Sequence, residues 1–272
     1  QPTAELQPGP AAEAAAELAR RSRILLDDGR TRQNPHPARH PNGAAFTSGN
    51  AFRGGDVVRG LIGVLDHRFG SYRLQPTEPA TVVQANPRPA QPDPVGGTLR
   101  VASFNVLNYF TTLTSAGSAC GPRQNQECRG ADTALELERQ RSKIVAALGA
   151  LDAHVVGLLE MENDRDGAAL ADLLGALDEA NAAGMYAAID TVGPLGSDVI
   201  RVALLYQPST VRPVGRTAVL DTRAFLDPLA SGQARNRPAL AQAFEEVASG
   251  ERFVVVVNHL KSKGSSCGRG DD

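Results

Sequence analysis

Three apolar segments of this sequence end in polar residues that a buried β-strand does not need. Asn105 follows Ser103-Phe104, Glu160 follows Val155 to Leu159, and Asn258-His259 follow Phe253 to Val257. In α/β sheets, ligands collect at the carboxyl ends of strands, because loops leave there and side chains can converge on a crevice. The pattern therefore predicts that Asn105, Glu160 and His259 lie in one site.

Glu160 has the chemistry of a metal ligand. An ionised carboxylate beside a buried strand is costly unless it is paired or bound to a cation, and Mg²⁺ takes one or two carboxylates while keeping several waters. The alternative is a salt bridge at the edge of the sheet.

Asn105 and His259 could also have purely structural roles. An Asn at a strand end is usually a turn former or a cap, and a lone His there is more often a satisfied core or surface residue. Lys261 and Lys263 follow His259, so imidazole, amide and ammonium groups could together meet a phosphate or another anion.

The elements that must position these residues form an α/β pattern from Thr98 onward, with strands alternating with helices. A capping box at Thr133 to Glu136 opens one helix, which Leu137, Ile144, Leu148 and Leu151 continue at helical spacing. A second helix is expected at Ala168 to Ala180. Strands are expected at Leu99–Val106, Val155–Leu159, Tyr186–Asp190, Ile200–Tyr206, Leu240–Val247 and Phe253–Leu260.

The N-terminal third is organised differently, because most of the 18 prolines lie in it. A helix at Ala11 to Arg20, opened by Pro10, precedes a strand that runs from Arg23 into an Asp-Gly turn, and a hairpin is expected between residues 55–65 and Tyr72 to Leu74. We expect a β-rich domain over residues 1–85, a proline-rich linker over 86–97, and a second domain over 98–272.

Composition narrows the function classes. The 272 residues carry 28 basic and 30 acidic side chains, a net charge of −2, so the chain lacks the footprint of a protein that holds nucleic acid by charge alone. A substrate phosphate must then be met by a local site or a metal. No uninterrupted apolar run is longer than that of Phe253 to Val257, which is far shorter than the roughly 20 residues of a membrane span.

The three cysteines are an odd number. Cys120 and Cys128 bracket a short loop that a disulfide would close in an oxidising compartment; the alternatives are two free thiols or, less favoured, a metal site. Cys267 is left over, and its partner is expected beyond Asp272.

Four segments carry a resemblance when they are taken in order: Ser103 to Phe110, Val156 to Asn163, Asp198 to Tyr206, and Val257 to Ser265. Together they resemble the bacterial extracellular nucleases of the endonuclease/exonuclease/phosphatase superfamily, relatives of deoxyribonuclease I. The resemblance covers roughly Leu99 to the C-terminus. The N-terminal third resembles part of the OB-like region that precedes this catalytic domain.

The resemblance implies a fold and a set of roles. The fold is α/β, the first half of a four-layered α/β sandwich. Asn105 would help position metal and phosphate, Glu160 would bind the metal, and His259 would contact the scissile phosphate and help the leaving oxygen depart. Asn258, Asp198 and Arg201 are carried over only as phosphate or cleft contacts. The implied metal is Mg²⁺, with Mn²⁺ and Ca²⁺ as alternatives.

The sequence departs from the family pattern because two later motifs, an Asp-x-Asn and a terminal Asp-His, do not follow His259. The family places both motifs well downstream of this histidine. We therefore expect the chain to be a fragment of a longer enzyme, truncated at both ends and nearly inactive by itself.

The resulting hypothesis is a secreted, metal-dependent nuclease that hydrolyses phosphodiester bonds of DNA, with RNA as an alternative substrate; no protein partner is implied. Two alternatives stay open. One is a phosphomonoesterase or phospholipid phosphodiesterase of the same superfamily, and the other is a non-catalytic secreted binding or adhesion protein.

Overall fold

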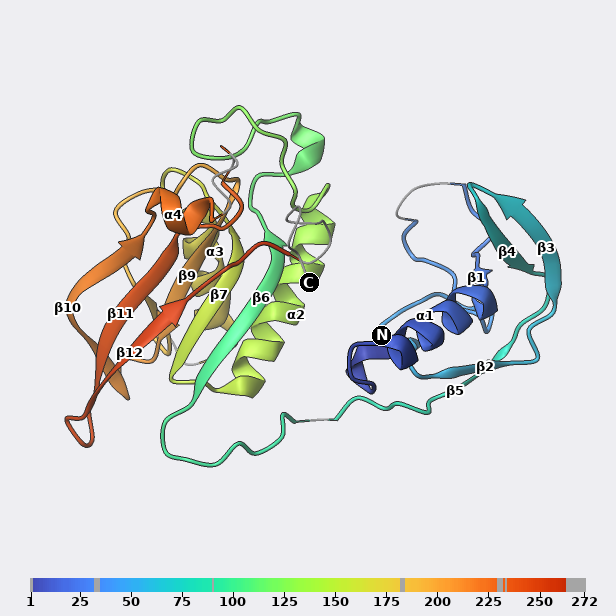
Figure 1. The fold of residues 1–272 in the computed structure, drawn as a ribbon, viewed down its shortest axis with the longest axis horizontal. Helices are drawn as coiled ribbons and strands as arrows, with labels where there is room; N and C mark the ends of the chain where they lie inside the picture. The colour runs from blue at the N-terminus through green and yellow to red at the C-terminus, as the bar shows by residue number, and fades with distance from the viewer. Residues whose placement is uncertain are drawn as a thin grey trace. The chain divides into compact units, whose positions relative to one another are not determined.

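The computed structural model describes residues 2–31, 35–89, 91–181, 184–228, 232 and 234–262. The chain divides into two compact units, Gln1–Ala90 and Gln91–Asp272, each of which is described by itself (Figure 1). In the described residues, no helix combines the length and the apolar character that crossing a membrane requires.

The first unit combines one long helix with two small sheets. The helix starts at Pro10 as expected, because proline is favoured in the first turn, where its missing N–H costs nothing. The expected hairpin is also confirmed: β3 and β4 pair antiparallel from Gly63↔Pro76 to Arg68↔Ser71. The elements are η1 (Pro2–Ala4), α1 (Pro10–Ser22), β1 (Leu25–Leu26), β2 (Val57–Arg59), β3 (Gly63–Arg68), β4 (Ser71–Pro76) and β5 (Thr81–Val83). The sheets have the orders β1-β4-β3 and β2-β5. The OB-like character of this unit stays a prediction.

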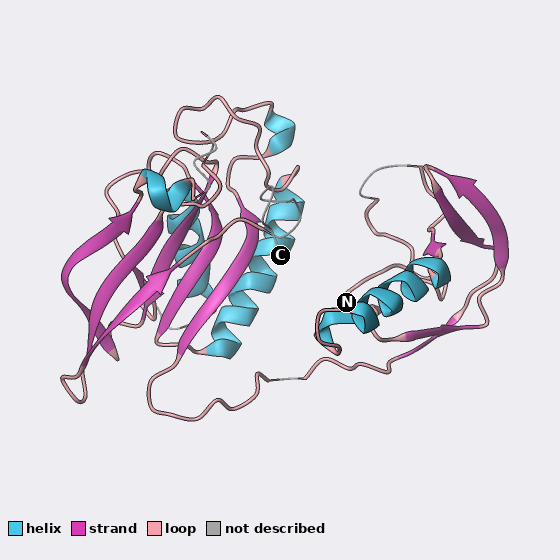
Figure 2. Cartoon of the chain, viewed as in Figure 1, coloured by secondary structure: helices cyan, strands magenta, loops and turns pink. Residues whose placement is uncertain are grey.

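The second unit has the alternation of strands and helices that the sequence predicts (Figure 2). Its elements are β6 (Val101–Tyr109), η2 (Thr114–Ala116), α2 (Ala134–Leu151), β7 (Val155–Glu162), α3 (Ala168–Ala180), β8 (Ala187–Ala188), β9 (Ile200–Tyr206), β10 (Val211–Leu220), α4 (Arg223–Leu226), β11 (Ala239–Glu246) and β12 (Arg252–Val257). The capping box is present, with Thr133 as the N-cap of α2 and Glu136 as its reciprocal partner.

Two sheets and two helices build the core of this unit in layers. The first sheet has the order β6-β7-β9-β8, with β6 parallel to β7 and the other pairs antiparallel, and the second has the order β10-β11-β12. Helices α2 and α3 pack on one face of the first sheet, and the second sheet packs on its other face (Figure 1). The α/β fold class is therefore confirmed, and three layers of the sandwich are described.

The period of two along each strand explains this layering. On β7, Val156 and Leu158 belong to the core shared with the helices, whereas Val155 belongs to the core shared with the second sheet. On β9, Ala203 and Val202 divide in the same way. A strand that is apolar at every position is thus buried on both faces.

Two details differ from the sequence expectation. The segment Val211–Leu220 forms a strand that the sequence does not predict, because Pro213 and Gly215 are unfavourable inside a central strand. The structure places this strand at the edge of its sheet, where a proline is tolerated. The strand at Leu99–Val106 was expected to be buried. It instead alternates, with Val101 51% exposed, because β6 is an outer strand of the described sheet.

Candidate functional site

Glu160 lies where two neighbouring strand pairings both lose register. The β6/β7 pairing is irregular between Asn105 and Tyr109, and the β7/β9 pairing is irregular between Leu158 and Met161. Glu160 has a φ of +68°, in the left-handed region that non-glycine residues seldom adopt. Bulges of this kind re-aim side chains and are frequent beside active sites.

The same level of the sheet holds a second strained stretch on β6. Leu107 and Asn108 have φ values of +57° and +52°. The turn brings the Asn108 backbone N–H to 3.2 Å from Oε2 of Glu160, and Nδ2 of Asn105 donates to Oε1 of Glu160 at 2.8 Å. Both carboxylate oxygens are therefore held by neighbours from β6.

The second sheet brings His259 to this carboxylate. His259 follows β12, and its Nε2 lies 3.7 Å from Oε1 of Glu160, which is too long for a hydrogen bond. The approach depends on Gly157: a Cβ built there would lie 2.8 Å from Cγ2 of Val257 on β12. Glycine at this position therefore lets β12 pack closely against β7.

The charge state of His259 is set by its surroundings. Burial lowers the pKa of its imidazole, and the Arg237 guanidinium lowers it further, while Glu160 and Asp198 act in the opposite direction. The imidazole is therefore neutral at pH 7. Its Nδ1 is buried and has no hydrogen-bond partner among the described residues.

Asp198 lies in the loop before β9 and contributes to the same electrostatic environment. Its Oδ2 accepts hydrogen bonds from Arg237, at 3.0 Å from Nε, and its Oδ1 lies 3.6 Å from Nη1 of Arg129. The backbone N–H of Arg237 donates to the carbonyl of His259 at 3.2 Å. Asp198 and Arg237 are thus part of the site. The sequence did not single out Arg237, because the only signal that it carries is its position just before an expected strand.

Arg201 is not brought to this cluster. It is buried, burial lowers the pKa of its guanidinium, and its donors reach the carbonyl of Gly193 at 3.1 Å and the hydroxyl of Thr191. It fastens the loop that precedes β9. Asn258 is exposed beside His259, Lys261 donates from Nζ to the Ser262 carbonyl at 2.7 Å, and Lys263 lies outside the described residues.

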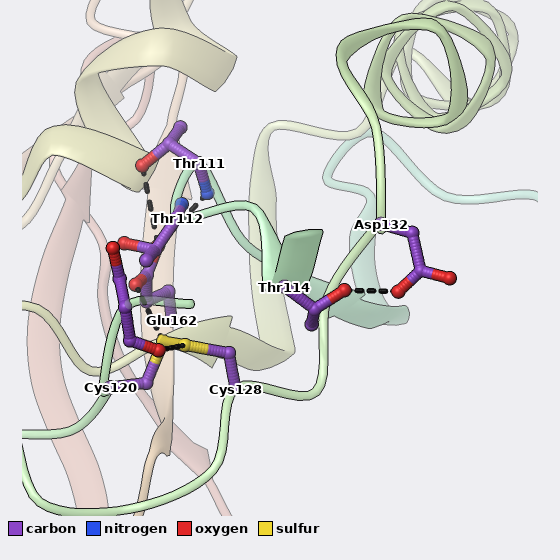
Figure 3. The surroundings of a disulfide bond; sticks show 8 residues. Thr111, Thr112, Thr114, Cys120, Cys128, Asp132 and Glu162 are labelled. Carbon is purple, nitrogen blue, oxygen red and sulfur yellow. Dashed lines mark hydrogen bonds between the residues drawn. A yellow bond between two sulfur atoms is a disulfide. The ribbon is translucent and has the colours of Figure 1, made fainter. Parts of the chain in front are cut away.

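A second glutamate of β7, Glu162, does not join the site. It is 3% exposed and accepts hydrogen bonds from the backbone N–H groups of Thr111 and Thr112 at 2.9 and 3.2 Å. Figure 3 shows its carboxylate beside the disulfide between Cys120 and Cys128, which confirms the expected pairing. Cys267 lies outside the described residues.

The donor set at Glu160 fits part of a magnesium site. The part of the chain that the structure describes contains no group of three or more His, Cys, Asp and Glu side chains that could hold a metal ion. Mg²⁺ needs less from a protein, because one or two carboxylates, waters and substrate phosphate oxygens complete its shell. Oδ1 of Asn105 accepts a hydrogen bond from the Leu107 N–H at 2.8 Å, while its Nδ2 donates to Glu160. The observed role of Asn105 is therefore to orient the Glu160 carboxylate.

Comparisons with known proteins give a distant structural similarity. No protein-family model matches the chain, and neither does any curated protein. Similar solved structures include the catalytic domain of human Nocturnin with a bound sulfate anion, at 19% identity and a TM-score of 0.35. Two more come from Bacteroides thetaiotaomicron, an endonuclease/exonuclease/phosphatase family protein and a mannosyl-6-phosphatase, each at 16% identity and a TM-score of 0.40.

Each alignment covers 61% of this chain and 51 to 53% of the other chain. This chain therefore spans about half the length of the solved structures that it matches. The similar structures include one protein described as a member of the endonuclease/exonuclease/phosphatase family and one described as a phosphatase.

Proposed function

We propose that this chain is part of a secreted, metal-dependent phosphodiesterase of the endonuclease/exonuclease/phosphatase superfamily, with DNA or RNA as its substrate. One observation carries the proposal. Asn105, Glu160 and His259, which are far apart in the sequence, converge at the strand ends of two packed sheets, as the ordered motifs predict.

Glu160 is the residue that would bind the metal, with Asn105 and the Asn108 N–H fixing the carboxylate. When bound, a divalent ion supplies Lewis-acid polarisation of a phosphoryl oxygen. Mg²⁺ is the proposed ion, because the donors are oxygens and the single described carboxylate leaves room for waters and phosphate.

His259 is the proposed phosphate contact. A neutral imidazole donates from only one of its nitrogens, and the lowered pKa keeps His259 in this form at pH 7. In the proposed role it donates to a phosphate oxygen beside Glu160 and stabilises the charge that develops on the leaving side. Asp198 and Arg237 hold the segments on either side of this imidazole.

Metal binding by the chain itself tests the first part of the proposal. Mn²⁺ titrated into the 272-residue chain and followed by the electron paramagnetic resonance of the free ion should show binding that Glu160→Gln removes. Glu179→Gln on the exposed end of α3 is the matched control, because it changes the same charge away from the site. Equal Mn²⁺ binding by wild type and Glu160→Gln would contradict the assignment of Glu160.

Hydrolysis tests the second part. The longest polypeptide that contains these 272 residues should nick supercoiled plasmid in the presence of Mg²⁺, and both EDTA and Glu160→Gln should abolish nicking. Release of phosphate from p-nitrophenyl phosphate or from a phospholipid without plasmid nicking would favour the other esterases of the superfamily. Nicking that persists in EDTA and in Glu160→Gln would refute the proposal.

A further inference from the structure

A pocket of about 430 Å³ lies on the Asp198 side of the site, between the loop closed by the disulfide and the segment that leads into β11. This size lies within the range of about 300–1,000 Å³ that is typical of small-ligand pockets. The pocket adjoins His259, because its lining residue Arg237 bonds the His259 carbonyl through its backbone N–H. The charged residues that line it are Arg129, Asp198, Arg235 and Arg237.

Arginines dominate the charged lining of the pocket. Two of the three, Arg237 and Arg129, face the one carboxylate in that lining, Asp198. Arg237 is largely buried and binds Asp198 through Nε and Nη2 at 3.0 and 2.9 Å. Arg129 is about half exposed, and its Nη1 stays 3.6 Å from Asp198, beyond hydrogen-bond distance. The Arg129 guanidinium therefore forms an ion pair with Asp198 but no hydrogen bond to it, and about half of the side chain stays accessible.

The position of Arg129 is fixed by the disulfide loop. Arg129 directly follows Cys128, which is bonded to Cys120. Within the loop, Cys120 and Gln126 exchange both backbone hydrogen bonds, at 2.8 and 3.2 Å. The Gln126 side chain donates to the Ser197 carbonyl at 2.7 Å, which ties the loop to the segment that carries Asp198.

The loop is also seated on the core. The two cysteines belong to a buried cluster with Phe110, Val199 and Ile200. Gly121 has a φ of +83°, and a Cβ there would lie 3.3 Å from Val199 and 2.8 Å from the Gln126 amide. The positive φ and the close Val199 side chain favour glycine at this position, and they seat the loop that leads to Arg129 on the core.

We propose that this pocket binds a phosphate of the substrate adjacent to the scissile one, and that Arg129, positioned by the closed disulfide, selects substrates that contain several phosphodiesters. The inference deepens the proposed function, since it takes the cluster around Glu160 and His259 as the place of cleavage. Guanidinium groups suit the role, because their planar fork matches phosphate oxygens and their charge is permanent.

Binding without cleavage tests the proposal. Fluorescence anisotropy in EDTA measures the affinity of the 272-residue chain for a labelled single-stranded oligodeoxynucleotide and for a labelled dinucleotide with one phosphodiester. Arg129→Gln should weaken oligonucleotide binding about three- to tenfold and reduce the slope of log K against log salt by about 0.7, the value for one lost contact to a single strand. Dinucleotide binding should stay unchanged.

Arg123→Gln is the matched control, because Arg123 is exposed in the same loop but does not line the pocket. It should leave both affinities within about twofold of wild type, while Arg129→Lys should retain most of the salt slope. Equal losses in Arg123→Gln and Arg129→Gln would show that only the net charge matters and would overturn the proposal.

Reduction tests the role of the disulfide. Dithiothreitol should weaken oligonucleotide binding by wild type as much as Arg129→Gln does and should have no further effect on Arg129→Gln, with circular dichroism confirming that the reduced chain stays folded. A loss on reduction that is equally large in Arg129→Gln would contradict the positioning role. In that case, Cys120 and Cys128 would act on binding without Arg129.

Inorganic phosphate separates a phosphate of the polymer from a free anion. If inorganic phosphate binds wild type but not Arg129→Gln, and oligonucleotide affinity is the same in both, the pocket takes free phosphate and the proposal is wrong. Because these measurements need no metal, they are independent of the hydrolysis test. Arg129→Gln could weaken oligonucleotide binding while the longest polypeptide fails to nick plasmid. That result would refute the nuclease assignment but would still support the phosphate pocket.

Discussion

Two glutamates that stand two positions apart on β7 have opposite surroundings. Glu160 is held by side-chain and backbone donors of β6 and faces His259, whereas Glu162 is buried under the backbone N–H groups that follow β6. A regular strand would present both on one face. The bulge between Leu158 and Met161 separates them, so one carboxylate is available for chemistry and the other fixes the fold.

Glu162→Gln should therefore lower the free energy of unfolding by about 1–2 kcal/mol, because charge-assisted hydrogen bonds become neutral ones in a buried place. Glu160→Gln should change stability less while removing Mn²⁺ binding. Urea denaturation of both variants gives the comparison, and an equal loss of stability in the two would contradict the division of roles.

The surroundings of His154 predict a pH dependence of stability that does not involve the candidate site. Its Nδ1 accepts the backbone N–H of Arg100 at 3.1 Å, and burial, followed by the charge of Arg100, lowers its pKa below the ordinary 6.5. Just below that pH the folded chain then binds fewer protons than the unfolded chain. The stabilisation that neutral His154 contributes is fully present above about pH 6.5, and it is lost as the pH falls below this value.

His154→Asn keeps an acceptor for Arg100 but cannot be protonated. The loss of stability between about pH 7.5 and about pH 5.5, measured by urea denaturation, should be smaller in this variant than in wild type. His259, whose pKa is also lowered, is present in both chains and does not affect the difference. An identical loss in the two chains would show that His154 is not the titrating group.

At the scale of elements, the contact between β7 and β12 brings the two sheets together beside the candidate site. Gly157 belongs to the first sheet and Val257 to the second, and the two meet where any Cβ on residue 157 would clash. The strand ends that carry Glu160 and His259 lie a few residues beyond this contact. The distance between the sheets at Gly157 therefore sets the distance between the two functional groups.

Gly157→Ala should lower the free energy of unfolding by about 1–3 kcal/mol, since overpacking forces the rigid Val257 side chain or its strand to move. Gly175→Ala on α3 is the control: nothing lies within 4 Å of its Cβ, and alanine there should stabilise the helix by about 0.5–1 kcal/mol. Thermal denaturation of both variants provides the measurement. A stabilised Gly157→Ala would contradict the close packing.

At the scale of the whole molecule, the near-neutral charge conceals a local concentration. The net charge is −2, yet three arginines line one pocket beside the candidate site, and two of them pair with Asp198. Phosphate recognition would thus depend on a few fixed residues and a metal, with little contribution from the overall field. The described residues contribute one carboxylate, Glu160, to the proposed metal site.

The 272-residue chain should accordingly nick plasmid far more slowly than a longer polypeptide that contains it. The same plasmid assay on both, at equal protein and Mg²⁺ concentrations, measures the ratio. Equal rates would mean that the described residues already hold a complete active site and that Glu160 and His259 do not define it alone.

The sequence by itself determined most elements of the second unit. Apolar runs, the Thr133 capping box and the amphipathic stripe of Ala168–Ala180 specify strands and helices locally, and their alternation specifies an α/β layering. It also singled out Asn105, Glu160 and His259, because polar residues at the ends of apolar strands stand out against the pattern. The edge strand at Val211–Leu220 was missed, since edge strands relax the rules that make central strands recognisable.

Only the tertiary structure decided which of these residues meet. Glu160 and Glu162 have similar sequence contexts, and a bulge visible only in the strand pairing separates them. Arg237 and Arg129 entered the site through contacts with Asp198 across 39 and 69 residues of chain. Arg201, three residues beyond Asp198, turned instead to Thr191 and Gly193 in the earlier part of the same loop. Local sequence sets the period and ends of each element, but the distances between elements arise from packing and register, which no short pattern encodes.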